Sequence, residues 1–174
     1  MLMPRRFEVR DYRRRRQATA GLAGLALAAC LSAAPTSDPV IPGSAEAPRA
    51  INVIMRDYLF EPTPLRLVRG ETVRFTVINA GLLAHDFVLG AADVQTAWAS
   101  AEAVSTPPAF TATPPPASVL PALAGLRIYL LTGQSASILY AVPPAGDLLL
   151  VCQVPGHAAL GMVGAIAVVE PSSP

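Results

Sequence analysis

Alternation of apolar and polar residues predicts β-strands along most of the chain after residue 50. From Val73 to Val77, apolar side chains alternate with Arg74 and Thr76, which is the two-residue period of a strand with one buried face. Several such strands separated by turns predict an all-β fold, an antiparallel Greek-key β-sandwich or barrel. The other predicted strands are short runs of β-branched or aliphatic residues, bounded by Pro or Gly, at 51–56, 65–67, 137–142, 147–152 and 162–169.

Residues 91–126 interrupt this pattern. The stretch contains six prolines and the only tryptophan, Trp98. A loop of this length is unusual in a compact domain. We interpret it as a long Pro-rich insertion that forms a surface excursion over one side of the barrel, a reading we favour over a partner-binding role. A short helix over 94–104 is one alternative within the insertion.

The stretch 148–169 contains no charged residue, so hydropathy alone would favour a membrane span. Pro155, Gly156 and His157 lie near its middle. Pro is poorly tolerated inside a central strand, and irregular backbone is not found where it would face lipid. Two sheet strands joined by a loop therefore fit the stretch better than a membrane helix.

The amino-terminal segment resembles an export signal. Seven of the 13 Arg lie before residue 17, and the uncharged apolar run 18–29 and Cys30 follow them, which is the layout of a secretory signal peptide. A bilayer crossing needs about 20 apolar residues, so an uncleaved anchor helix is the weaker alternative. We predict a signal peptide over 1–29, with export by either the Sec or the twin-arginine route.

The tetrad Leu27-Ala28-Ala29-Cys30 resembles the lipobox of bacterial lipoproteins. The resemblance implies lipidation of Cys30 and a firm membrane attachment through acyl chains. An ordinary signal peptide with an incidental Cys is the alternative. Residues 30–50 are rich in Pro, Ser and Ala, which is typical of a flexible tether. We expect a domain over 51–172, anchored through lipid at a periplasmic or extracytoplasmic membrane face.

Charge argues against nucleic acid as a partner. The net charge of +1 arises from the arginines of the amino-terminal segment. From Cys30 onward there are 6 Arg against 10 Asp and Glu, a balance of −4 with His neutral. Nucleic-acid binding depends mainly on positive charge that neutralises phosphates, so a nucleic-acid-binding function is not expected.

Four soft or borderline metal ligands are the main candidates for chemistry. Cys152, His157 and Met162 lie on one short loop, and His85 follows the predicted strand 73–79. Two imidazoles, one thiolate and a weak axial thioether form the ligand set of blue-copper electron-transfer sites. Taken singly, each residue has an ordinary structural alternative as a satisfied His, a buried Cys or a core Met. After Cys30 the chain holds only these two His, one Cys, and Met55 besides Met162, so their joint pattern favours copper.

The loop Cys152-Gln153-Val154-Pro155-Gly156-His157-Ala158-Ala159-Leu160-Gly161-Met162 and the segment 79–87 resemble the cupredoxins, the type 1 blue copper family. The loop looks most like that of rusticyanin and less closely like that of azurin, which has a shorter gap before Met. The resemblance implies one type 1 copper ion in a Greek-key barrel that shuttles single electrons. His85, Cys152 and His157 would be equatorial ligands and Met162 the axial ligand. Asp86 would brace the Cys loop, where azurin and plastocyanin have Asn.

Other functions fit the sequence less well. A binuclear copper centre needs a second Cys on the loop, where residue 156 is Gly, and copper enzymes with a further copper need His that this chain lacks. We therefore do not expect an enzyme. A structural zinc site prefers four strong ligands, which Met cannot supply. A Cys30–Cys152 disulfide is the chemical rival. The functional alternative is a copper carrier or delivery protein that supplies a membrane oxidase.

The ligand loop also predicts how partners bind. An uncharged docking patch is expected around His157, and small, brief interfaces are typical of electron-transfer partners. We expect a monomer whose partners are redox proteins such as cytochromes or a terminal oxidase. The predicted patch consists of Val154, Pro155, Ala158, Ala159 and Leu160.

Overall fold

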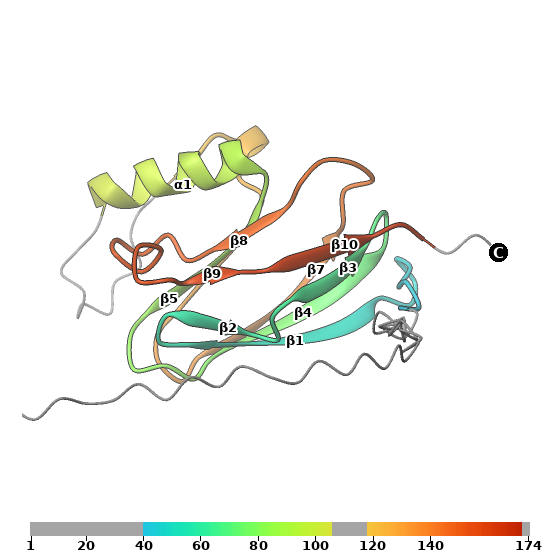
Figure 1. Ribbon diagram of the computed structural model, residues 1–174, viewed down its shortest axis with the longest axis horizontal. Coiled ribbons are helices and arrows are strands. Elements are labelled where there is room, and N and C mark those ends of the chain that lie inside the picture. Colours follow the sequence, from blue (N-terminus) through green and yellow to red (C-terminus); the bar gives the residue numbers. More distant parts are fainter. Residues whose placement is uncertain (1–39, 106–117, 172–174) are drawn as a thin grey trace, which may run out of the picture. The chain divides into compact units, whose positions relative to one another are not determined.

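The computed structural model of the protein describes residues 40–105 and 118–171. The predicted signal peptide, Cys30, residues 31–39 of the tether and residues 106–117 of the predicted insertion lie outside this part of the chain. The order of elements is shown in Figure 1. The strands are β1 Arg49–Arg56, β2 Leu59–Glu61, β3 Leu65–Val68, β4 Thr72–Asn79, β5 His85–Gly90, β6 Leu126–Leu130, β7 Ser135–Ala141, β8 Leu149–Val151, β9 Val163–Gly164 and β10 Ile166–Val169; the helices are α1 Ala92–Ser105 and the 3-10 turn η1 Pro121–Leu123.

The strands form a β-sandwich, which confirms the predicted fold class. One sheet has the order β2-β1-β4-β7, a second has the order β6-β5-β8-β9, and β3 pairs with β10. The expectation of purely antiparallel pairing is wrong, because β1 pairs with β4 and β3 pairs with β10 in parallel. Alternation along a strand indicates which residues face the core, but it does not indicate which neighbouring strand pairs with it or in which direction. The mixed pairing of the sheets could therefore not be predicted from the sequence.

Three strands were not predicted from the sequence. Every residue of β5 is buried, so it lacks the alternation that marks a strand with one solvated face. The strand β2 has only three residues, which is too short for a periodic signal. The strand β6 does alternate, with Leu126, Ile128 and Leu130 buried. Its alternation could not be separated from the Pro-rich stretch, because its first residue, Leu126, is the last residue of that stretch.

The uncharged stretch 148–169 forms β8, a loop, β9 and β10. Strands joined by a loop were expected, but the prediction of one continuous strand over 162–169 is wrong, because β9 pairs with β8 whereas β10 pairs with β3. Among the residues that the structure describes, no helix is both long enough and apolar enough to span a membrane. The helix α1 occupies the first part of the predicted insertion and extends slightly beyond the range 94–104.

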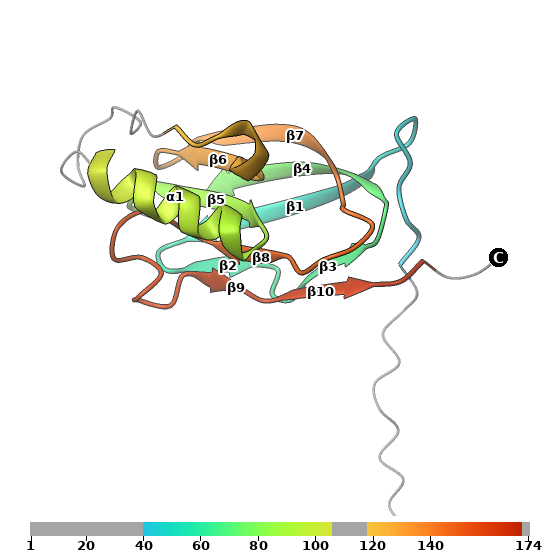
Figure 2. The same cartoon turned by 90° about the horizontal axis from the view of Figure 1, so that it is seen from above.

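The helix α1 lies over β5 and β8 (Figure 1 and Figure 2). Val94 and Trp98 of α1 pack against Val88 on the outward face of β5. The inward neighbours Phe87 and Leu89 belong to the main core. Both faces of β5 are thus covered, one by the sandwich and one by the helix. Because both faces are covered, β5 has no solvent-exposed face, although it carries the ligand candidate His85.

Candidate metal centre

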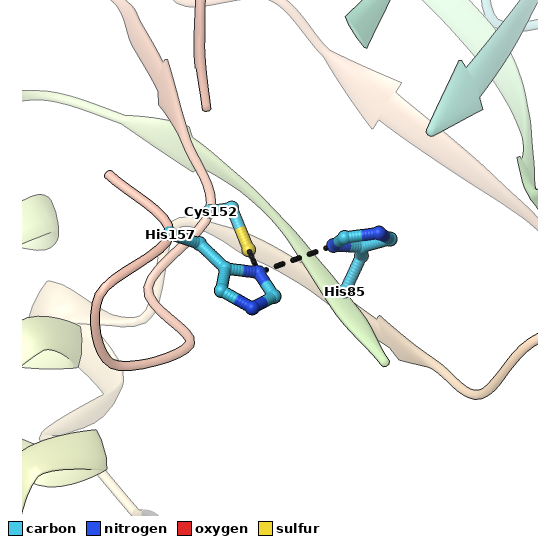
Figure 3. A group of neighbouring side chains, drawn as sticks. All are labelled: His85, Cys152 and His157. Atoms are coloured by element: carbon cyan, nitrogen blue, oxygen red, sulfur yellow. Dashed lines mark hydrogen bonds between the residues drawn. The ribbon is translucent and has the colours of Figure 1, made fainter. Parts of the chain in front are cut away.

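Two side chains of one loop meet a third from a distant part of the sequence at one end of the sandwich. His85, Cys152 and His157 each offer a ligand atom, and these atoms all lie within 4.8 Å of one another. The Nδ1 atoms of the two histidines are 3.2 Å apart, and Cys152 Sγ is 3.4 Å from His157 Nδ1. Figure 3 shows the thiol and both rings turned toward one point, with His85 on β5 and the other two on the loop. Three donor atoms at these separations can bind a single ion.

His85 is positioned by the sandwich. It is the first residue of β5 and pairs with Leu130 of β6. Its side chain is fully buried. Its Nδ1 faces His157, and its Nε2 lies 3.0 Å from Asp57 Oδ1. Both ring nitrogens therefore have defined neighbours, which fixes the orientation of the ring.

Cys152 and His157 are positioned by a loop that is closed by its own backbone hydrogen bonds. His157 N donates to Val154 O, Leu160 N donates to Gly156 O, and Cys152 N donates to Met162 O, at 3.0, 3.1 and 3.1 Å. Gly156 has φ of +88°, a backbone conformation that glycine adopts without steric cost. The loop therefore turns tightly enough to bring His157 back to Cys152.

Met162 lies where the loop rejoins the sandwich. Its backbone N donates to His157 O at 3.0 Å. Its side chain is fully buried and belongs to the main core. Met162 is the last residue before β9, at the end of the loop that carries Cys152 and His157. Its assignment as axial ligand stays a prediction.

Asp86 links the metal centre to the helix side of β5. Its backbone N donates a hydrogen bond to Cys152 Sγ at 3.3 Å. Its carboxylate Oδ2 accepts a hydrogen bond from Arg127 Nε at 2.9 Å. Burial raises the pKa of Asp86 to about 7, although the Arg127 guanidinium opposes this shift. The hydrogen bond to the thiol comes from the backbone of Asp86, so it does not depend on which side chain this residue carries.

Burial favours the uncharged form of all three ligand candidates. Burial lowers the pKa of His85 and of His157, which favours the neutral imidazole that metals bind. Burial raises the pKa of the Cys152 thiol to about 12, although the Asp86 N–H opposes the shift. A thiol of this kind becomes a thiolate when a cation binds it. Two neutral imidazoles and one soft sulfur, all buried, match the preference of copper for nitrogen and thiolate ligands.

The predicted docking patch surrounds the loop side of the centre. Ala158, Ala159 and Leu160 are exposed, as is Pro155, while Val154 is half-buried. Leu160 is 62% exposed, whereas His157 itself is only 6% exposed. The imidazole is thus nearly buried, whereas the uncharged residues beside it on the loop are mostly exposed.

Four further residues around the centre could not be predicted from the sequence: Asp57, Tyr58, Glu102 and Arg127. Asp57 and Tyr58 form the turn between β1 and β2, and the Tyr58 ring meets the His157 ring edge-on at 5.3 Å. Arg127 bonds to both Asp86 and Glu102 and lies 4.5 Å from the centre of the Trp98 ring. None of these residues lies in a recognisable motif, because each reaches the site only through tertiary contacts.

Two proteins with known names are similar to this chain in sequence. The chain is 33% identical over 126 residues to the copper-resistant cuproprotein CopI of Rubrivivax gelatinosus, covering 72% of this chain and 69% of that protein. It is 30% identical over 143 residues to the protein of the same name from Pseudomonas aeruginosa, covering 72% and 78% of the two chains. No protein-family model matches the chain.

The solved structure of auracyanin B is similar in fold. It superposes with a TM-score of 0.54 at 29% identity, covering 74% of this chain and 97% of auracyanin B. The likeness agrees with the cupredoxin resemblance of the ligand loop and with the sandwich described above. From the identity and coverage of the relatives and the shared fold, the chain belongs to the CopI family of cuproproteins and has the cupredoxin fold.

Proposed function

We propose that this protein binds one copper ion between His85, Cys152 and His157, with Met162 as the axial ligand, and transfers single electrons. The observation that carries the proposal is the buried cluster of three donor atoms within 4.8 Å. The name of the CopI relatives describes them as cuproproteins, which supports copper as the metal. The copper ion, when bound, supplies the one-electron change between Cu(I) and Cu(II).

The surrounding residues suit electron transfer because they resist rearrangement. His85 is fixed at both ring nitrogens, and the loop of Cys152 and His157 is closed by internal hydrogen bonds. Full burial of Cys152 and Met162 excludes water from the sulfur side. A site held in this way keeps its geometry in both oxidation states, so little has to move when an electron passes.

The proposal is tested by the absorption spectrum of the purified domain after addition of one equivalent of Cu(II). We expect an intense visible band from thiolate-to-copper charge transfer, and rapid loss of the band on reduction. Cys152→Ser should remove the band, whereas Met55→Leu, a buried Met on β1, serves as the matched control and should keep it. A colourless protein that nevertheless holds stoichiometric copper would contradict electron transfer through this site.

A second candidate function is copper handling, as a carrier that supplies the metal to a membrane oxidase or limits its toxicity. The relatives are named copper-resistant, which favours this candidate independently of the site geometry. Metal exchange and electron self-exchange separate the two functions. Rapid release of copper to a competing chelator with slow self-exchange would favour handling, and the opposite pair of rates would favour electron transfer.

We also propose export and attachment to a membrane through lipid on Cys30, so that the domain acts on a periplasmic or extracytoplasmic face. The lipobox-like tetrad before Cys30 supports this proposal. Cys30→Ser should move the protein from the membrane fraction to the soluble exported fraction.

We further propose a non-enzymatic monomer that exchanges electrons with cytochromes or a terminal oxidase. Light scattering tests the oligomeric state, and reduction kinetics with such proteins test the choice of partner.

A further inference from the structure

The turn between β1 and β2 contacts both imidazoles of the metal centre. Asp57 Oδ1 lies 3.0 Å from His85 Nε2, and the Tyr58 ring contacts the His157 ring. Tyr58 has φ of +67°, a left-handed conformation that is uncommon for a residue other than glycine. Such conformations persist where the surrounding structure determines them, and they cluster at functional sites. The turn is therefore a candidate positioning element.

A single oxygen of Asp57 joins this turn to the loop that leads into β5. Asp57 Oδ1 accepts hydrogen bonds from Leu82 N at 2.9 Å and from Leu83 N at 3.2 Å, in addition to its contact with His85 Nε2. A carboxylate only accepts hydrogen bonds. The facing Nε2 must therefore carry the proton of the His85 ring.

Gly81 provides the space for this contact. A Cβ atom at residue 81 would lie 2.5 Å from Asp57 Oδ1 and 2.7 Å from His85 Nε2. Both separations are too short for non-bonded atoms, so any side chain here would push the carboxylate and the ring apart. The absence of a side chain at Gly81 is thus a requirement of the Asp57–His85 pair.

We propose that Asp57 is a positioning residue for His85. Its carboxylate holds the ring proton on Nε2 and leaves the lone pair of Nδ1 directed at His157 and Cys152. The inference rests on the proposed copper function for its purpose, but the protonation of the ring is defined without the metal. Ligating histidines are commonly oriented by a carboxylate in this way, and loss of such a partner typically lowers metal affinity about 10- to 100-fold.

The first test is nitrogen-15 NMR of the His85 ring in the copper-free wild-type protein. We expect the proton on Nε2. Asp57→Ala and Gly81→Ala should each give a mixture of ring tautomers and bind copper about 10- to 100-fold more weakly. Asp57→Asn retains an acceptor oxygen and should restore the Nε2–H form and most of the affinity. Asp147→Asn, at an exposed aspartate of the β7–β8 loop, is the matched control and should change neither quantity.

The outcomes distinguish this inference from the proposed function. A wild-type ring protonated on Nδ1 would overturn the inference without any variant. So would unchanged tautomer and affinity in a folded Asp57→Ala protein, as judged by its thermal unfolding. If Asp57→Ala does not fold, Gly81→Ala and Asp57→Asn still decide between the two results. Failure of the wild-type protein to bind copper would instead overturn the proposed function, while the NMR result would still judge the role of Asp57.

Discussion

The two imidazoles of the metal centre are fixed by different parts of the chain. His85 begins a strand that is buried on both faces, so its place is set by the sandwich. His157 lies on a loop and is held by loop hydrogen bonds and by the ring of Tyr58. A substitution in the core therefore affects mainly the first imidazole, and a change in the loop affects mainly the second.

At the scale of single residues, Met162→Leu tests the axial role of the thioether. Because Leu and Met have similar volumes, we expect the substitution to lower the free energy of unfolding by less than about 1.5 kcal/mol. Loss of the thioether donor would destabilise the more highly charged Cu(II) state more than the Cu(I) state, so the reduction potential should rise by tens of millivolts. Voltammetry measures this shift, for which about 59 mV equals a tenfold change in relative affinity.

Met55→Leu is the control for this substitution, because Met55 is also fully buried in the same core. Its reduction potential should equal that of the wild-type protein. Equal potentials for both variants would show that Met162 only fills the core.

Sequence analysis could identify the ligand candidates because they are scarce. The part of the chain after Cys30 holds two His and a single further Cys, and the structure brings these three together. Asp57 could not be found in this way, because aspartate is common in turns and nothing in its neighbourhood reveals a contact with a residue 28 positions later in the chain. Arg127 was missed for the same reason, since its carboxylate partners come from β5 and α1.

At the scale of elements, α1 supports the strand that carries His85. Gln95 of α1 donates hydrogen bonds to Val88 O of β5 and to Leu149 O of β8, at 3.1 and 2.9 Å. It also accepts one from Gln153, directly after Cys152, at 2.7 Å. The helix thus ties together both strands and the start of the ligand loop.

Trp98→Ala tests how much α1 contributes to stability. Trp98 is 7% exposed, packs with Val88 and donates from Nε1 to Ala124 O at 2.8 Å. We expect a loss of about 3–5 kcal/mol in the free energy of unfolding, measured by urea denaturation, because a large cavity and an unpaired carbonyl remain. Val104→Ala on the same helix, where the side chain is 87% exposed, should change little. Equal effects of the two substitutions would contradict this role of the helix.

The turn between β3 and β4 depends on a buried carboxylate. Glu71 pairs with Arg49 at 2.5 Å and accepts hydrogen bonds from Val68 N and Gly43 N at 2.7 and 3.3 Å. Burial alone would raise the pKa of Glu71, but Arg49 and these backbone donors together lower it. Because Arg49 remains partly solvated, we expect Glu71→Gln to lower the free energy of unfolding by about 2–4 kcal/mol at neutral pH.

This difference should depend on pH with a definite sign. A carboxyl whose pKa is lowered on folding contributes its full stability above its unfolded pKa, about 4.3, and loses it as the pH falls through the folded value. Wild type and Glu71→Gln should therefore converge in acid, as measured by denaturation from neutral pH down to about 3. Glu61→Gln is the control, because its pair with Arg56 is about half exposed and should contribute at most about 1 kcal/mol. A constant difference at all pH values would contradict the assignment.

Prediction of the elements succeeded where one face of a strand is solvated. The strand β4 alternates buried and more exposed residues along its whole length, and its position was predicted within one residue. The strand β5 gave no such signal because α1 covers its second face. One of the three ligand candidates, His85, thus lies on an element that periodicity alone does not reveal.

At the scale of the whole molecule, the ligand loop offers an uncharged surface on a domain whose charge after Cys30 is −4. We expect Leu160→Asp to slow electron transfer with a redox partner about tenfold, since a charge placed in an apolar interface costs about 1.4 kcal/mol or more. The reduction potential and the visible band should not change. Stopped-flow kinetics at several salt concentrations measures the rate, and the wild-type rate should depend weakly on ionic strength.

Leu139→Asp is the matched control for this experiment. Leu139 lies on β7 and is 50% exposed, so the same charge is added outside the ligand loop. A similar slowing by both substitutions would show that partners do not use the surface around His157.

The sandwich as a whole was predictable, whereas its pairing was not. Strand count, turn spacing and alternation led to a two-layer β fold. The strands β1 and β4 pair in parallel although β2 and β3 lie between them in the chain, and β3 and β10 pair in parallel across most of the domain. No local pattern in the sequence encodes these pairs.

The closure of the ligand loop on itself has a consequence for how such proteins can diversify. Cys152 N bonds to Met162 O, and the remaining turns between them are satisfied within the segment. The strands β8 and β9 hold only its two ends, through the pairing of Val151 with Val163. Besides its ends, the segment from 152 to 162 is contacted by the Asp86 N–H at Cys152 and by the Tyr58 ring at His157. Residues between these points can therefore change in length or composition without altering the strands, provided that the two contacts are kept.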